Sequence, residues 1–127
     1  MKRGLGKEDM MHKDFAGLLK QYQAYGKLDC EWFSYDASGE YRKQSTRALL
    51  KAKGLAPGKS DYEFRKLKND TMHHIYIEMK AGKGKQSENQ KKFEETCRDC
   101  KNNRYYLAYS VEEAIKILEE EKILKLE

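Results

Sequence analysis

The sequence lacks the features of secreted and membrane-spanning proteins. It contains no run of about 20 apolar residues, the length that crosses a bilayer. No apolar segment follows Met1-Lys2-Arg3, so we expect no signal peptide. Three cysteines, an odd number, argue against a disulfide framework and for a reducing compartment. We therefore expect a soluble, cytoplasmic protein that does not bind a membrane.

The composition predicts one small, polar domain. A chain of 127 residues is long enough for a single core, so we treat residues 1–127 as one domain. The net charge of +5 argues for a polyanionic partner, although a modest excess of basic residues also occurs on proteins that bind no nucleic acid.

The distribution of charge is more informative than the total. Residues 41–59 contain no acid, and a second group of lysines lies at residues 80–92. Acids gather instead in residues 112–127, which predicts a polarised molecule with one basic side. The alternative is a solvated helix face and a flexible loop. The candidate phosphate-binding residues are Arg42, Lys43, Arg47, Lys51, Lys53, Lys59, Lys83 and Lys85.

The run from residue 74 to residue 80 alternates between polar and apolar side chains. Ile75, Ile77 and Met79 form the apolar set, which is typical of a half-buried strand. Successive side chains of a strand point to opposite faces, so Glu78 and Lys80 would share a face at about 7 Å from each other. An ordinary strand with a solvated outer face would have the same spacing, and an acid-x-Lys pair is common.

A second alternating run begins at Asp61, after the turn residues Ala56-Pro57-Gly58-Lys59-Ser60. If the two strands pair antiparallel, Asp61 and Glu78 converge and can bind one divalent cation, since Mg²⁺ requires oxygen ligands. Such an ion polarises a phosphoryl oxygen and lowers the pKa of water, and Lys80 would stabilise the developing charge. The pattern is therefore compatible with phosphodiester hydrolysis.

The remaining elements predict an α/β fold. Ser87-Glu88-Asn89-Gln90 forms a capping box that opens a helix with Phe93, Thr96, Cys97 and Cys100 on one face. Apolar residues at helical spacing predict a helix at 8–25, closed by Gly26, and a second capping box at 110–113 opens a final helix. Strands are expected at 28–35 and 104–109, and a short basic helix at 45–53. This order suits a mixed central sheet with helices on both faces.

Taken together, Pro57-Gly58-Lys59-Ser60-Asp61, Ile77-Glu78-Met79-Lys80 and Gln90 resemble the VRR-NUC family of the PD-(D/E)xK nuclease superfamily. The resemblance covers about residues 8–124. It implies a restriction-endonuclease-like core, a mixed sheet flanked by helices, and cleavage of DNA that depends on Mg²⁺ or Mn²⁺. Small members of this kind resemble Holliday-junction resolvases and act as homodimers, so branched DNA is the implied substrate and a phage or a bacterial cell the implied setting.

The resemblance also assigns roles to individual residues. Asp61 and Glu78 match the metal-binding carboxylates, with the Met79 carbonyl as a further ligand, Lys80 matches the catalytic lysine, and Gln90 matches the glutamine of the motif. Glu8 is the counterpart of a glutamate on the first helix. Two departures are visible, because Ser60 replaces the usual proline and His12 stands where a glutamine often follows that glutamate. A nicking, flap-directed or restriction-like nuclease and a non-catalytic DNA-binding module remain alternatives.

Overall fold

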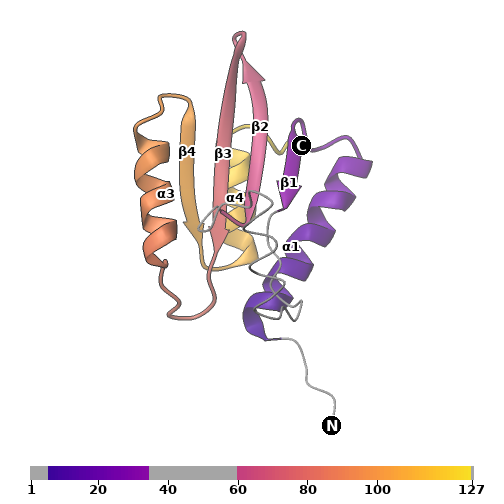
Figure 1. The fold of residues 1–127 in the computed structure, drawn as a ribbon. Coiled ribbons are helices and arrows are strands. Elements are labelled where there is room, and N and C mark those ends of the chain that lie inside the picture. The colour runs from indigo at the N-terminus through magenta and orange to yellow at the C-terminus, as the bar shows by residue number, and fades with distance from the viewer. Residues whose placement is uncertain (1–5, 35–59, 127) are drawn as a thin grey trace, which may run out of the picture.

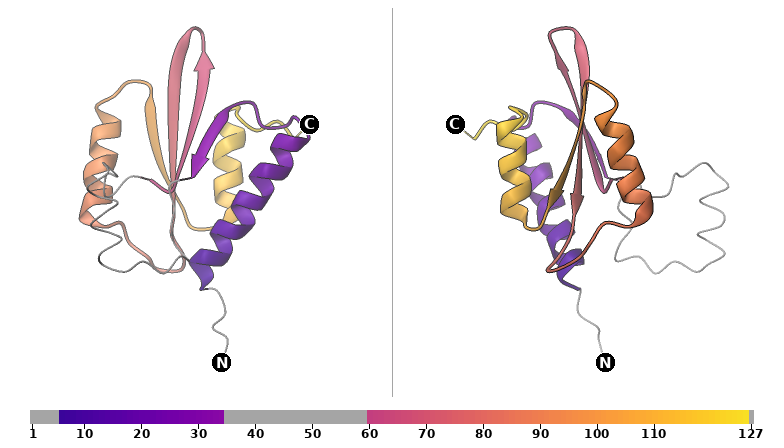
Figure 2. Two further views of the ribbon diagram at one scale, coloured as in Figure 1. Left: turned by 45° about the vertical axis from the view of Figure 1, so that its right-hand side comes forward. Right: turned by 90° about the vertical axis from the view of Figure 1, so that its left-hand side faces the viewer.

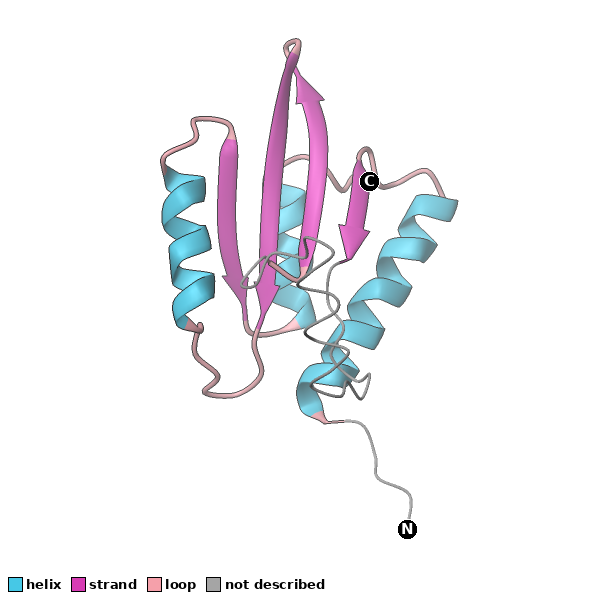
Figure 3. Cartoon of the chain, in the orientation of Figure 1, coloured by secondary structure: helices cyan, strands magenta, loops and turns pink. Residues whose placement is uncertain are grey.

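A computed structural model describes residues 6–34 and 60–126 of the chain. Seven elements follow one another in these residues, and they confirm the predicted α/β class (Figures 1 and 3). They are α1 (Lys7–Ala24), β1 (Glu31–Ser34), β2 (Tyr62–Lys68), β3 (Thr71–Met79), α3 (Glu88–Arg98), β4 (Asn103–Ala108) and α4 (Val111–Glu120).

Several sequence-based predictions lie outside the described residues. These are the basic helix at 45–53, the Pro57-Gly58 turn, and six of the eight candidate phosphate-binding residues: Arg42, Lys43, Arg47, Lys51, Lys53 and Lys59. Within the described part of the chain, no helix combines the length and apolar character needed to cross a membrane.

The sheet is mixed and has the strand order β1-β2-β3-β4. β2 pairs antiparallel with both β1 and β3, whereas β3 and β4 are parallel. A hairpin joins β2 to β3, and its turn residues Asn69 and Asp70 have φ of 50° and 65°, values that asparagine and aspartate tolerate better than most residues. The parallel pair needs a crossover connection, which α3 provides.

Helices cover both faces of the sheet, as predicted. Seen along the sheet, α3 lies on one side and α1 and α4 lie on the other (Figure 2). The main core fills the α1/α4 side, where Phe15 and Leu19 of α1 and Leu118 of α4 are fully buried with Phe64 and Ile77 of the sheet. The apolar stripe predicted for the first helix is therefore confirmed.

The prediction that β3 is only half-buried is wrong. All five residues from Ile75 to Met79 are buried, including Tyr76 and Glu78 on the face expected to be polar. The reason is that α3 packs on this face, with Phe93 edge-on to Tyr76 at a ring-centroid distance of 4.9 Å. Strand periodicity marks two faces, but it does not report whether a helix covers the second one.

Details of the α3 packing also differ from the prediction. Cys97 is buried and Phe93 is partly buried, but Thr96 is exposed. Cys100 is exposed because α3 ends at Arg98, so this residue is not on the helix at all. The two thiols therefore do not share one packed face.

Two of the predicted local features need correction. The strand expected at 28–35 begins only at Glu31 and runs to Ser34, the last described residue there, because Leu28 instead bridges to Leu124 near the C-terminus. In the second capping box, Ser110 accepts from the Glu113 amide as expected, but the Glu113 carboxylate accepts from the Tyr109 amide.

The acidic C-terminal surface is also smaller than predicted. Glu121 is 8% exposed, and its carboxylate accepts hydrogen bonds from the Arg104 guanidinium and the Tyr106 hydroxyl. Charge counted along the sequence therefore overstates the acid at this surface, because this carboxylate is paired inside the protein.

Candidate functional site

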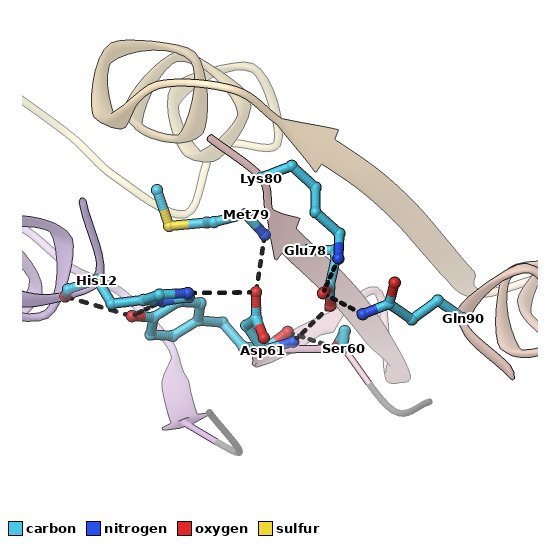
Figure 4. A network of polar contacts seen from close by, with 8 residues as sticks. His12, Ser60, Asp61, Glu78, Met79, Lys80 and Gln90 are labelled. Atoms are coloured by element: carbon cyan, nitrogen blue, oxygen red, sulfur yellow. Dashed lines mark hydrogen bonds and ion pairs between the residues drawn. The ribbon is translucent and has the colours of Figure 1, made fainter. Parts of the chain in front are cut away.

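Strand register brings Asp61 and Glu78 together. Tyr62 of β2 pairs with Ile77 of β3, so the antiparallel ladder places Asp61 beside Glu78 at the next position. The Met79 amide donates to Asp61 Oδ2 over 2.8 Å, and the Asp61 amide donates to Glu78 Oε2 over 3.0 Å (Figure 4). Each carboxylate thus accepts a hydrogen bond from the backbone of the neighbouring chain segment, at the point where β2 begins and β3 ends.

Glu78 is a strongly perturbed carboxyl group. It is only 1% exposed, so its side chain cannot belong to a solvated outer face. Its pKa is raised to about 8: burial is the largest cause, the negative charge of Asp61 adds to it, and the positive charge of Lys80 opposes it. Desolvation and a neighbouring like charge both disfavour the ionised carboxylate, so a cation at this position would be stabilised.

Lys80 lies on the Glu78 face, as the spacing predicted. Its Nζ is 3.7 Å from Glu78 Oε1, and its side chain is 14% exposed. The turn after β3 lies against the aliphatic part of this lysine: the Gly84 amide donates to the Ala81 carbonyl, and a Cβ atom added to Gly84 would lie 3.5 Å from Lys80 Cβ. The turn therefore limits the positions open to the side chain.

Gln90 has two roles at once. Its Oε1 accepts from the Ser87 amide, which completes the predicted capping box of α3. Its Nε2 donates to Glu78 Oε1 over 2.5 Å. The amide of Gln90 thus contacts Glu78, and the cap of α3 and the position of this carboxylate are linked.

A second group forms where α1 approaches the start of β2. Candidate ligand atoms of Glu8, His12 and Asp61 all lie within 4.8 Å of one another. His12 Nε2 is 3.6 Å from Asp61 Oδ2, and the imidazole is almost completely buried. The sequence left open whether His12 takes part. Its spacing of four residues from Glu8, which places both on one helix face, was the available signal.

The chemistry of these donors fits a hard divalent cation. Asp61, Glu78 and Glu8 offer carboxylate oxygens, the ligand type that Mg²⁺ and Mn²⁺ prefer. The Met79 amide donates a hydrogen bond to Asp61, and the Met79 side chain is buried in the core. Its carbonyl as a ligand stays a prediction.

Two of the candidate phosphate-binding residues lie beside the site in the chain. Lys83 and Lys85 are exposed and belong to the connection between β3 and α3, directly after Lys80. Their side chains are therefore available to an anionic partner.

Comparisons of the chain with protein-family models, with curated proteins and with solved structures find no match.

Proposed function

We propose that this protein is a metal-dependent deoxyribonuclease with a restriction-endonuclease-like core of the VRR-NUC kind. The observation that carries the proposal is the meeting of Glu78, Asp61 and Lys80 at neighbouring strand ends, with Glu78 buried. Burying a carboxylate beside another one costs folding stability, so such a pair is expected where function requires it. A solvated surface pair would have no such cost.

Each residue has a role in this proposal. Asp61 and Glu78 would hold Mg²⁺ or Mn²⁺, which when bound acts as a Lewis acid toward the scissile phosphate and lowers the pKa of water. Lys80 neutralises charge that develops on the phosphate during in-line attack by water. Gln90 is a positioning residue, because its amide holds the Glu78 carboxylate in place.

The proposed substrate is DNA, in particular branched or four-way junctions. The basic excess, including exposed Lys83 and Lys85, supports a polyanionic partner. Symmetric cutting of a junction requires two sites on opposed strands, which a twofold homodimer supplies. Junction preference and dimerisation rest on the resemblance to the VRR-NUC family.

A non-catalytic DNA-binding module is the alternative from another class. Against it stands the placement of two carboxylates beside a lysine, since like charge near a phosphate lowers affinity without any benefit to a binder. In a binder, Asp61→Asn should maintain or increase DNA affinity. In the nuclease the same substitution abolishes cleavage while binding persists.

The test is cleavage of a labelled four-way junction and of a linear duplex of the same sequence, each with Mg²⁺ or Mn²⁺. Lys80→Ala should lower the rate by about a hundredfold or more, the usual cost of removing a group that stabilises transition-state charge. Lys116→Ala, which removes an exposed lysine of α4 that has no assigned role in the site, is the matched control and should retain most activity.

Paired symmetric cuts in the junction that Lys80→Ala removes would support the resolvase. Equal cleavage of both substrates would keep the nuclease and discard junction preference, and nicked and flapped substrates would then separate the other nuclease types. Intact DNA binding without any cleavage would refute the nuclease and leave the binding module.

A further inference from the structure

His12 lies between two carboxylates at the junction of α1 and β2. Glu8 and His12 are one helical turn apart near the start of α1, and the helix is anchored by the buried Phe15 and Leu19. This packing directs the imidazole toward Asp61, with 3.6 Å between His12 Nε2 and Asp61 Oδ2 (Figure 4).

We infer that Glu8, His12 and Asp61 form a cation position in which the imidazole nitrogen is a direct ligand, and that this ligand makes the protein select Mn²⁺ or another transition-metal ion over Mg²⁺. The inference deepens the proposed function, on which it rests, by naming the class of metal. It adds a nitrogen donor from α1 to the carboxylates of the β-sheet.

The orientation of the imidazole supports direct ligation. The Tyr62 hydroxyl lies 3.0 Å from His12 Nδ1 and 3.4 Å from the His12 carbonyl oxygen, so the imidazole has a hydrogen-bond partner at Nδ1. This contact holds the ring with Nε2 facing the Asp61 carboxylate, 3.6 Å from Oδ2, and direct ligation uses the tautomer in which Nδ1 carries the proton. Metal-binding histidines are typically oriented in this way, with the other ring nitrogen donating to a fixed partner.

His12 Nε2 and Asp61 Oδ2 face each other where the proposed cation would bind. Glu8 adds a third ligand atom, and all three lie within 4.8 Å of one another, a spacing that one ion can bridge. Tyr62 is itself held firmly, because it is 1% exposed and packs edge-on against Phe15 with ring centroids 4.9 Å apart. His12 and Tyr62 are thus buried and fixed by packing, whereas Glu8 and Asp61 are partly buried at the edge of the position.

The nitrogen ligand determines which ions are favoured. Mg²⁺ is bound almost entirely by oxygen and retains several waters. Imidazole suits Mn²⁺ less than the later metals but far better than it suits Mg²⁺, and affinity for a nitrogen-containing site rises from Mn²⁺ toward Co²⁺ and Zn²⁺. Replacing this histidine with an oxygen donor should therefore reduce the preference for transition metals without removing the carboxylates.

The experiment is Mn²⁺ binding to the full chain without DNA, followed by electron paramagnetic resonance. Pulsed measurements should detect coupling between Mn²⁺ and an imidazole ¹⁴N nucleus in the wild type. His12→Gln should abolish the coupling and lower the ratio of Mn²⁺ to Mg²⁺ affinity by about tenfold or more. Even residues that only hydrogen-bond a metal ligand typically contribute about tenfold to metal affinity, so the loss of the ligand itself should cost at least as much. His74→Gln is the control, since this histidine contacts Glu63 on the other face of the sheet and should leave the coupling unchanged.

Two further variants keep the inference testable if His12→Gln folds poorly. Glu8→Gln should weaken Mn²⁺ binding and keep the ¹⁴N coupling. Tyr62→Phe, which removes only the hydroxyl that orients the imidazole, should weaken binding by about tenfold. Absence of coupling in the wild type, or coupling that survives in His12→Gln, overturns the inference.

The outcome separates this inference from the proposed nuclease. Mg²⁺-dependent cleavage without ¹⁴N coupling would refute the histidine ligand and retain the enzyme. Coupling that His12→Gln removes, in a protein that cleaves no DNA, would establish the metal position and refute the nuclease.

Discussion

Glu78→Gln should make the metal-free protein more stable at pH 8. Ionising this buried carboxyl beside Asp61 opposes folding, which is the cause of its raised pKa of about 8. Each pH unit between the ordinary value of 4.5 and that raised value costs about 1.4 kcal/mol, so the upper bound is about 5 kcal/mol at pH 8. The single side-chain oxygen of glutamine can accept from only one of the two groups that donate to Glu78, the Asp61 amide and the Gln90 side chain. The lost hydrogen bond reduces the gain in stability by about 1–3 kcal/mol. We expect a net gain of about 1–3 kcal/mol in the free energy of unfolding.

The gain should depend on pH with a definite sign. The folded-state pKa of Glu78 lies above the unfolded value, so the folded protein binds this proton more tightly. Its contribution to stability is fully present below pH 4.5 and is lost as the pH rises to about 8. The free energy of unfolding of the wild type should therefore decrease relative to that of Glu78→Gln as the pH rises through this window. Near pH 5 the two proteins should be about equally stable.

Urea denaturation with a chelator, at pH 5 and at pH 8, measures both quantities. Glu112→Gln is the matched control, because this exposed glutamate of α4 changes the net charge equally without relieving burial. With Mg²⁺ or Mn²⁺ added, only the wild type and the control should gain further stability, since a bound ligand stabilises the folded state by mass action. A wild type that is as stable as Glu78→Gln at pH 8 without metal would refute the reasoning.

Four more substitutions test parts of the site and the scaffold. Gln90→Glu keeps an oxygen for the Ser87 amide but places a carboxylate against Glu78, so the cleavage rate should fall about tenfold. Ser87→Ala removes only the side-chain cap of α3, so it should lower the free energy of unfolding by about 1 kcal/mol in urea denaturation and leave the cleavage rate nearly unchanged. Gly84→Ala adds a Cβ atom 3.1 Å from a backbone carbonyl oxygen and 3.5 Å from the lysine at the site, so cleavage should fall about tenfold while stability changes by only about 1 kcal/mol. Burial raises the pKa of Glu121, but hydrogen bonds from its arginine and tyrosine partners outweigh burial and lower it. Glu121→Gln should therefore lower the free energy of unfolding by about 1–3 kcal/mol at pH 7. In the same denaturation assay, this difference from the wild type should shrink as the pH falls below 4.5.

Local signals in the sequence predicted much of the scaffold. The apolar stripe of α1, the alternation in β3 and the capping box at Ser87 each depend on residues within a few positions, so they were readable without tertiary information. The convergence of Asp61 with Glu78 followed from one further assumption, antiparallel pairing, which the short connection between the strands favoured.

Features that depend on packing between distant elements could not be predicted in this way. Glu78 is buried because α3 covers its face, and nothing in the alternation of β3 reports that cover. The approach of His12 to Asp61 depends on how α1 lies across the sheet. Glu121 looked like one of several surface acids until the fold placed it against Arg104 on β4.

The site and the strand pairing are parts of one structure. β2 begins at Tyr62 and β3 ends at Met79, and just beyond that pairing the Asp61 and Glu78 side chains accept hydrogen bonds from the backbone amides. A substitution of Asp61 therefore loosens the end of the hairpin as well as removing a ligand, so loss of cleavage alone does not distinguish the two effects. Structural damage lowers metal-free stability, whereas loss of a ligand from an electrostatically strained site raises it. A variant that gains metal-free stability, loses metal-induced stabilisation and loses cleavage therefore identifies a functional carboxylate.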